Sequence, residues 1–329
     1  GEKMPQHLSL LRILAANGYQ TNFYYGGDSK FDNMNLFLKR QRTSSIIDLN
    51  SFGPGYQRLP SNGEGFSWGY GDFELFRKYF SVLDKSSSNK PQISVILTVS
   101  THSPFRVNNQ ARYDDLFDKR LAASQPDKAV AKSRKEFKPH FASVLFMDEA
   151  VRKFFNDYKS RPSFKNTIFL ITGDHRMPDI PMSTKIDRYH VPLIIYSPLL
   201  NRTAKFPAVV SHLDIAPSLL AYIKRTKGFK SPSLVSWLGA GLDTSRVFRN
   251  INNYPLIQSK QGVNNYLSGE FFWDGQDLQL LDANMGLSPI QDDKQKNKTI
   301  QLLNKFKLKN SRMMNSASGL VPDSLLQKY

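Results

Sequence analysis

The sequence predicts an α/β fold: a mostly parallel sheet sandwiched by helices, with a small antiparallel subdomain at the C-terminal end. Apolar runs as long as buried strands recur along the first part of the chain, and segments with helical spacing of apolar residues separate them. Such alternation is typical of parallel sheets covered by helices. After about residue 228 the pattern changes to short runs between turn residues, which is typical of antiparallel strands.

Local patterns predict the elements of the first part. Apolar residues recur at helical intervals in residues 8–17, 73–83, 141–158 and 215–223. The last of these helices is expected to start with Asp214 as its N-cap. Strands are expected where β-branched and aromatic residues gather before turn residues, in residues 21–25, 93–99, 167–172 and 191–196. Loops are expected in residues 50–72, 108–138 and 176–188, the second with a short helix or two.

The second part contains shorter elements. Short antiparallel strands are expected at residues 255–258, 265–273 and 277–282, and a basic terminal helix at residues 292–310. We therefore expect an α/β core in residues 1–228, and antiparallel strands with a basic terminal helix of the same fold in residues 229–329.

Composition limits the class of protein. The chain has 329 residues, of which 40% are hydrophobic, so it can bury a sizeable core. It has no apolar run of membrane-spanning length. It also has no cysteine, which excludes disulfides, thiolate metal sites and cysteine nucleophiles.

The formal net charge of +17 favours anionic partners. Anionic lipid surfaces and phosphorylated or sulfated glycans fit this charge, and so does a merely solvated basic surface. No nucleic-acid-binding module signature is present, so we expect no nucleic-acid partner.

Chemistry-bearing residues follow the apolar run of residues 167–172. Gly173 ends the predicted strand, and Asp174, His175 and Arg176 come directly after it. Open α/β sheets place their functional groups at the carboxyl ends of strands. A carboxylate and an imidazole at such an end can face one divalent cation. A Gly-Asp turn with an adjacent histidine is the simpler interpretation of the same residues.

Several strand-end motifs together resemble the alkaline-phosphatase/sulfatase superfamily, and within it the lipoteichoic acid synthase-like branch. The motifs keep the family's order along about 200 residues. They are Asn17–Thr21 running into Tyr25–Asp28, Trp68-Gly69 with Asp72, Thr101–Phe105, Thr172–His175, and Val191–Ile194 followed by Ser211–Ser218.

The resemblance implies a metal-dependent transfer of a phospho-group through a covalent threonine or serine intermediate. Matched residue by residue, Asp174 and His175 would bind one divalent metal, either manganese, magnesium or zinc. His102 would donate a hydrogen bond to an anionic oxygen of the transferring group. The acceptor would be a hydroxyl of a lipid or glycan.

The sequence departs from the family pattern at its start. The resemblance places the first strand, an acidic metal ligand and the nucleophile before the helix of residues 8–17. We therefore expect an N-terminally truncated domain that is inactive by itself. Its parent enzyme is expected to be anchored through a missing N-terminal segment at the extracytoplasmic, periplasmic face of the membrane.

Further residues are candidates for substrate binding. Lipoteichoic acid synthases have a histidine where Tyr25 falls, and tryptophan and arginine where Asp32 and Met34 fall, so phosphoglycerol is in question as the transferred group. Arg176 is a candidate replacement for the missing arginine. Trp68 lies in a family motif, whereas Phe66 beside it is expected in the core. His190 and His212 come after Asp174 and His175 in the sequence and are candidates to line the site.

Two other functions stay open. A sulfatase or phosphodiesterase would pass the group to water after the same first half-reaction. A non-catalytic domain would only bind anionic glycans or lipids. The retention of Asp174, His175 and His102 favours an enzyme.

Overall fold

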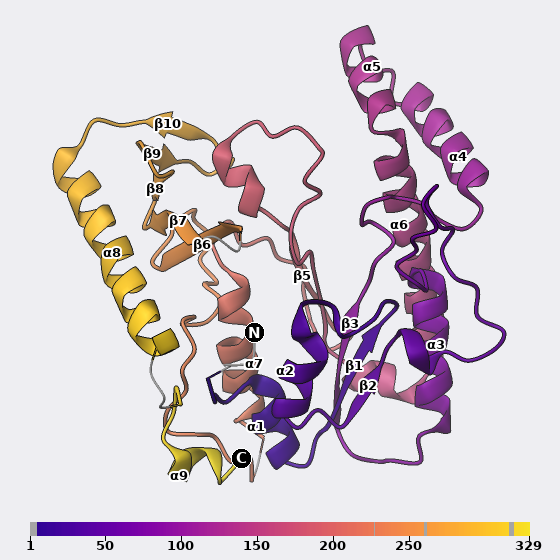
Figure 1. The fold of residues 1–329 in the computed structure, drawn as a ribbon, viewed down its shortest axis with the longest axis horizontal. Coiled ribbons are helices and arrows are strands. Elements are labelled where there is room, and N and C mark those ends of the chain that lie inside the picture. Colours follow the sequence, from indigo (N-terminus) through magenta and orange to yellow (C-terminus); the bar gives the residue numbers. More distant parts are fainter. Residues whose placement is uncertain (1–4, 227, 260–261, 316–318) are drawn as a thin grey trace. The chain divides into compact units, whose positions relative to one another are not determined.

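The computed structural model describes residues 5–226, 228–259, 262–315 and 319–329. The chain divides into two compact units (Figure 1). Unit 1 comprises residues 14–165, and unit 2 comprises residues 5–13 together with the described residues between 166 and 329. The expected boundary at residue 228 lies within unit 2, and the division into residues 1–228 and 229–329 stays a prediction.

Unit 1 contains a three-stranded parallel sheet with the strand order β2-β1-β3. Its strands are β1 (Gln20–Tyr25), β2 (Ser45–Ile47) and β3 (Gln92–Leu97). Phe23 of β1 lies opposite Ile46 on one side and Val95 on the other. The predicted strands at residues 21–25 and 93–99 are confirmed, the second ending two residues earlier. β2 was not predicted from the sequence, because three residues are too few to show a period.

The helices of unit 1 are α2 (Met34–Arg40), α3 (Asp72–Lys85), α4 (Gln110–Ala123), α5 (Lys128–Glu136) and α6 (Lys138–Lys159). Aromatic rings join α3 to α6: the ring centroids of Phe76 and Phe154 are 4.8 Å apart, and those of Phe80 and Phe154 are 5.3 Å apart. The predicted helices of residues 73–83 and 141–158 are thereby confirmed. The expected helices within residues 108–138 are α4 and α5.

Unit 2 contains a two-stranded sheet of β4 (Phe169–Thr172) and β5 (Leu193–Tyr196). The two strands are antiparallel, and Thr172 lies opposite Leu193. The parallel pairing predicted for the first part is therefore confirmed in unit 1 but does not extend to this pair. β4 is also less buried than its apolar sequence predicts, since no residue of it is fully buried. Ile194 of β5 is 52% exposed.

The remaining sheet of unit 2 has five antiparallel strands in the order β10-β9-β8-β7-β6 (Figure 1). They are β6 (Asn253–Ser259), β7 (Gly262–Ser268), β8 (Phe271–Trp273), β9 (Leu278–Leu281) and β10 (Leu287–Pro289). The helix α8 (Asp293–Asn315) packs on β7 and β8. The predicted antiparallel subdomain and basic helix are thus confirmed.

Three further helices complete the described chain. They are α1 (Leu10–Ala16), α7 (Ile215–Ile223) and α9 (Asp323–Leu326). In unit 2, Leu8 and Ile13 are fully buried against Leu220, Val321 and Leu326, so the N-terminal segment is part of this core. Short 3-10 helices are η1 (Phe31–Asn33), η2 (Leu49–Ser51), η3 (Pro162–Asn166), η4 (Lys185–Tyr189) and η5 (His212–Asp214). Among the described residues, no helix has the length and apolar character needed to cross a membrane.

Candidate functional site

In unit 1, the loop after β3 presents His102 to solvent. The backbone turns tightly here, since the His102 N–H donates to the Val99 carbonyl at 3.0 Å and the Phe105 N–H donates to the His102 carbonyl at 2.8 Å. The imidazole Nδ1 lies 3.1 Å from the Ser103 carbonyl oxygen. A carbonyl only accepts, so this bond keeps a proton on Nδ1. His102 can then donate from Nε2 only as the imidazolium ion.

Trp68 holds this loop from a separate segment of unit 1. Its indole Nε1 donates to the Ser103 carbonyl at 2.7 Å, and its ring centroid lies 4.5 Å from that of His102. Phe31 and Phe66 pack edge-on against the indole, each at 5.3 Å. The structure therefore brings together Trp68 and His102, two residues that the sequence predicted for one site. Phe66 was expected in the core. This expectation is wrong, because the Phe66 side chain packs on the Trp68 indole and is 47% exposed.

Asp72 lies fully buried beneath the same loop. Its Oδ1 accepts from the backbone N–H groups of Val99 and Ser100, each at 3.2 Å, and its own N–H donates to the Ser100 hydroxyl at 3.1 Å. Burial raises the pKa of this carboxyl group. The sequence placed Asp72 in a family motif without a role, and the structure shows that it supports the His102 loop.

Tyr25 ends β1 and is only 4% exposed. Its ring covers Gly27 so closely that a Cβ atom there would lie 2.8 Å from the ring. Gly26 is equally confined, because a Cβ atom would lie 2.0 Å from the Tyr70 carbonyl oxygen. The Gly-Gly pair thus lets the segment of Tyr70 approach the end of β1. Substrate binding by Tyr25 stays a prediction.

In unit 2, Asp174 and His175 follow β4 and are both exposed. Asp174 Oδ2 lies 3.6 Å from His175 Nε2. The other atoms of the pair are held locally: Asp174 Oδ1 accepts from the His175 N–H at 2.9 Å, and His175 Nδ1 lies 2.7 Å from the Arg176 carbonyl oxygen. One oxygen and one imidazole nitrogen therefore lie side by side at the strand end.

This donor pair fits one side of a divalent cation's coordination shell. Carboxylate oxygen and imidazole nitrogen suit magnesium, manganese and zinc. The described residues contain no group of three or more histidine, aspartate and glutamate side chains arranged to hold a metal. The pair alone supplies two ligands, whereas zinc sites in proteins use three or four protein ligands.

His212 joins this strand end. Its Nε2 lies 3.2 Å from the hydroxyl oxygen of Thr172, the last residue of β4. Of His190 and His212, it is therefore His212 that contacts β4, the strand that Asp174 follows. The contact with Thr172 was not predictable, because nothing in the sequence relates residues 172 and 212. His190 is exposed at the end of η4, where its N–H donates to the Asp187 carbonyl.

Asp214 positions the loop that carries His212. The expected role of Asp214 as an N-cap of α7 is wrong, since its side chain makes no cap bond to that helix. It is fully buried and accepts instead from the N–H of Ser211 at 2.8 Å, the N–H of Ala240 at 3.0 Å and the Tyr254 hydroxyl at 2.7 Å. Burial, and secondarily the bond to Asp214, raises the pKa of Tyr254.

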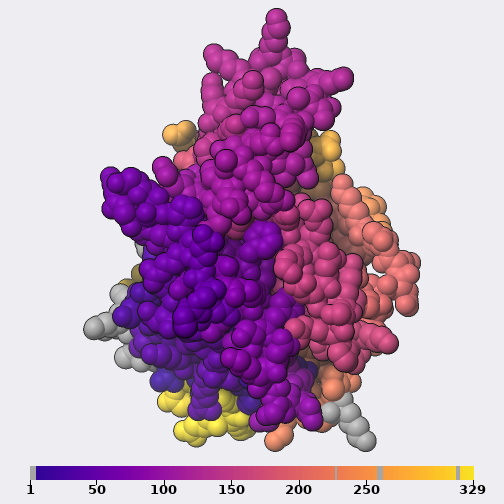
Figure 2. All heavy atoms as spheres, turned by 90° about the vertical axis from the view of Figure 1, so that its right-hand side faces the viewer, coloured from indigo at the N-terminus to yellow at the C-terminus, as the bar shows by residue number. Residues whose placement is uncertain are grey.

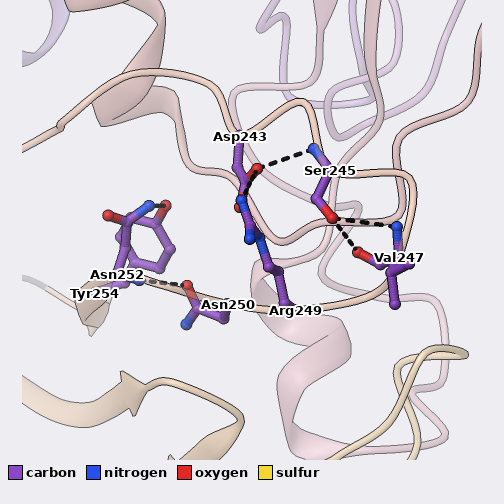
Figure 3. A network of polar contacts seen from close by, with 7 residues as sticks. All are labelled: Asp243, Ser245, Val247, Arg249, Asn250, Asn252 and Tyr254. Carbon is purple, nitrogen blue, oxygen red and sulfur yellow. Dashed lines mark hydrogen bonds and ion pairs between the residues drawn. The ribbon is translucent and has the colours of Figure 1, made fainter.

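Polar contacts continue from Tyr254 along residues 243–254 (Figure 3). Arg249 makes a two-point ion pair with Asp243, with bonds of 2.7 and 2.9 Å. The Asn252 amide donates to the Tyr254 hydroxyl at 2.8 Å. Of these contacts, the bond from Asn252 holds the Tyr254 hydroxyl, which in turn donates to the buried carboxylate of Asp214.

Arg176 is half-buried, and its guanidinium donates to the Ile180 carbonyl within its own loop. The structure therefore gives Arg176 a role in shaping the loop after His175. Its predicted contact with an anionic group stays a prediction.

Comparisons with known proteins identify the family of this chain. Residues 1–224 match the family model described as Sulfatase. Phosphoglycerol transferase I of Citrobacter koseri is 26% identical over 181 residues, which cover 52% of this chain and 20% of that protein. The protein of the same name from Escherichia fergusonii is 27% identical over 176 residues, with the same shares covered. The matched part is thus about a fifth of the length of these curated relatives.

Two solved structures share the fold. One is a protein of the alkaline phosphatase superfamily from Vibrio parahaemolyticus, with a TM-score of 0.66, 20% identity, and coverage of 95% of this chain and 70% of that one. The other is the lipoteichoic acid synthase LtaP from Listeria monocytogenes, with a TM-score of 0.63, 16% identity, and coverage of 91% and 72%. The resemblance that the motifs predicted is confirmed. Since the family model matches more than half of its residues, this chain belongs to the Sulfatase family.

Proposed function

We propose that this chain is part of a metal-dependent transferase that moves a phosphoglycerol- or phosphoethanolamine-type group to a hydroxyl of a lipid or glycan. The observation that carries the proposal is the strand end of β4, where Asp174 Oδ2 and His175 Nε2 lie 3.6 Å apart and exposed. Relatives named phosphoglycerol transferase support a transferred phospho-group rather than sulfate.

Asp174 and His175 are the proposed metal ligands. The bond between His175 Nδ1 and the Arg176 carbonyl keeps a proton on Nδ1 and leaves the lone pair of Nε2 to coordinate. A divalent metal, when bound, stabilises negative charge on phosphate oxygens and lowers the pKa of a hydroxyl nucleophile. Manganese, magnesium and zinc all suit this donor pair.

His102 and Trp68 are the proposed contacts to the transferring group. As the imidazolium ion, His102 donates from Nε2 to an anionic oxygen, while Nδ1 stays on the Ser103 carbonyl. Trp68 keeps that carbonyl in place and covers the imidazole. His190, His212, Tyr25 and Arg176 are the other proposed substrate contacts.

The proposed reaction has two steps. A threonine or serine hydroxyl of the full-length protein attacks phosphorus, its proton leaves, and the donor's alcohol departs with a proton. The acceptor hydroxyl then attacks the phosphorylated residue, which releases the protein hydroxyl. We propose that the full-length protein is membrane-anchored and acts at the extracytoplasmic face, where lipid donors are accessible.

The test is a transfer assay with the full-length natural protein that contains this chain. Labelled phosphatidylglycerol or phosphatidylethanolamine is supplied with Mn²⁺, with and without a glycan or glycolipid acceptor. Label on the acceptor is the expected result, and Asp174→Asn should abolish it. Asp115→Asn is the matched control, since Asp115 is an exposed residue of α4 paired with Lys119.

Each outcome of the assay assigns one function. Label that appears only as free phospho-compound, with or without acceptor, would replace transferase by phosphodiesterase. If phospholipids stay intact while a sulfated sugar loses sulfate, the protein is a sulfatase. Binding of the donor without turnover under every condition would assign a non-catalytic domain.

A further inference from the structure

The helix α8 carries positive charge along its whole length. Its only acidic residue is Asp293, in the first turn. Its basic residues are Lys294, Lys296, Lys298, Lys305, Lys307, Lys309 and Arg312. Among the described residues, no ion pair involves any of these side chains. The described part of unit 2 thus offers these side chains no carboxylate partner, and Lys296 lies instead over the Trp273 ring, 5.4 Å from its centroid.

One face of α8 is used to fold unit 2. Thr299 is fully buried, Leu303 is 4% exposed, and Phe306 packs with them against the antiparallel sheet. The partners of Leu303 in this cluster include Tyr266 of β7 and Trp273 of β8. The spacing of four and three residues keeps this apolar stripe on one side of the helix.

A second face of α8 is basic and exposed. Lys294, Lys298, Lys305, Lys309 and Arg312 follow at intervals of four, seven, four and three residues, so they form one stripe. All five side chains are exposed. At 1.5 Å per residue the stripe is about 27 Å long. Around the helix axis, the direction of the basic stripe differs from that of the packed stripe by roughly a third of a turn.

An exposed apolar side chain accompanies this basic stripe. Leu308 lies between Lys305 and Arg312 at helical spacing and is 54% exposed. Lysines beside exposed apolar residues on one helix are typical of helices that lie on an anionic bilayer, with charges at the headgroups and apolar groups below them. A polynucleotide would use the charge but not Leu308.

We propose that the exposed face of α8 docks on an anionic lipid bilayer. The partner is the membrane surface itself. The basic stripe contacts the lipid phosphates, and Leu308 reaches the boundary between the headgroups and the acyl chains. This docking does not depend on Asp174 or on catalysis. It orients unit 2 with the outer side of α8 toward the membrane.

The test is sedimentation of the 329-residue chain with vesicles of phosphatidylcholine alone and of phosphatidylcholine mixed with phosphatidylserine, an anionic lipid that is not one of the proposed donors. Binding is expected only to the mixed vesicles, and high salt should release it. Each basic residue at an anionic surface contributes about fivefold to partitioning, so replacing Lys305, Lys309 and Arg312 by glutamate should weaken binding at least about 100-fold. Leu308→Ser should weaken it by a smaller factor without changing its salt dependence.

The matched control reverses the same number of charges on α5. Lys128, Lys132 and Lys135 are exposed and lie on one face of this helix in unit 1. The tip formed by α4 and α5 projects from the rest of unit 1, so its side chains are accessible (Figure 2). Replacing these lysines by glutamate gives the same net charge as the α8 variant and should leave most of the binding intact.

Several results would overturn the proposal. Equal losses from the α5 and α8 variants would assign vesicle binding to net charge alone. Unchanged binding by the α8 variant, with a native circular dichroism spectrum, would exclude this face. Tighter, α8-dependent binding to a single-stranded oligonucleotide, indifferent to Leu308→Ser, would assign the stripe to nucleic acid. Because Asp174→Asn should bind vesicles normally, failure of docking is distinguishable from failure of the proposed function.

Discussion

The loops that follow β3 and β4 both present candidate site residues, but they are held in different ways. The loop after β3 is supported from below by the buried Asp72 and from the side by Trp68. The loop after β4 holds Asp174 and His175 by bonds within the same few residues, and both side chains are exposed. His102 therefore depends on contacts from other segments of unit 1, whereas the proposed metal ligands depend on local backbone geometry.

The largest effect is expected at the exposed loop. His175→Ala removes one of two proposed metal ligands and should lower transfer by the full-length protein at least about 1000-fold. Because the imidazole is exposed, the thermal midpoint should hardly change. Activity and melting are measured on the same preparation, with excess Mn²⁺ in the assay. Near-normal activity of His175→Ala would remove this loop from the proposed site.

A somewhat smaller effect is expected for His102→Ala. Loss of one donor to the transferring group should lower kcat about 100-fold, with little change in KM. Steady-state kinetics of the full-length protein measure both constants.

Trp68→Phe is the matched control for this histidine. It keeps a ring near His102 but removes the indole N–H that donates to the Ser103 carbonyl. If Trp68 only positions His102, the variant should lose less activity than His102→Ala, and the two changes should not be additive. Full additivity would show that Trp68 acts independently of His102.

For the loop after β3, the expected effect is on the free energy of unfolding. Asp72→Ala leaves the buried N–H groups of Val99 and Ser100 without their acceptor and should destabilise unit 1 by about 2–4 kcal/mol. Urea unfolding followed by far-ultraviolet circular dichroism measures the change. The same substitution at the exposed Asp174 should cost less than about 0.5 kcal/mol, because its carboxylate is exposed and is held by the N–H and imidazole of the adjacent His175. Equal costs at the two positions would contradict the comparison.

The sequence predicted most of the fold because its apolar runs are long. The helices α3 and α6 and the strands β1, β3 and β4 each carry several apolar residues at one period, whereas β2 has three residues and no period. Sheet pairing was harder. The apolar sequences of β4 and β5 resemble parallel strands, yet these strands pair antiparallel, since strand direction depends on connections and not on composition.

The candidate site was predictable where neighbours in sequence form it. Asp174 and His175 are adjacent, and Trp68 and His102 fall in motifs of the family. Other contacts join residues 40 positions apart: His212 contacts Thr172, and the Tyr254 hydroxyl donates to Asp214. Such pairings arise from tertiary folding and leave no periodic signal. For the same reason, Asp214 was predicted to cap the following helix, whereas in the structure it is buried and accepts from Ser211, Ala240 and Tyr254.

The smallest predicted effect is a pH dependence of the free energy of unfolding, which we expect from Asp72 beneath the loop after β3. Burial raises the pKa of Asp72 above its ordinary value of 3.8, so the folded chain holds this proton at pH values where the unfolded chain has released it. Stability should therefore fall as pH rises from about 3.8 through the raised folded value. Asp72→Asn keeps an oxygen acceptor for Val99 and Ser100 but cannot ionise, so this slope should vanish from its curve of unfolding free energy against pH. If wild type and Asp72→Asn have parallel curves, Asp72 is not the group responsible, and the Oδ1 bonds alone support the loop.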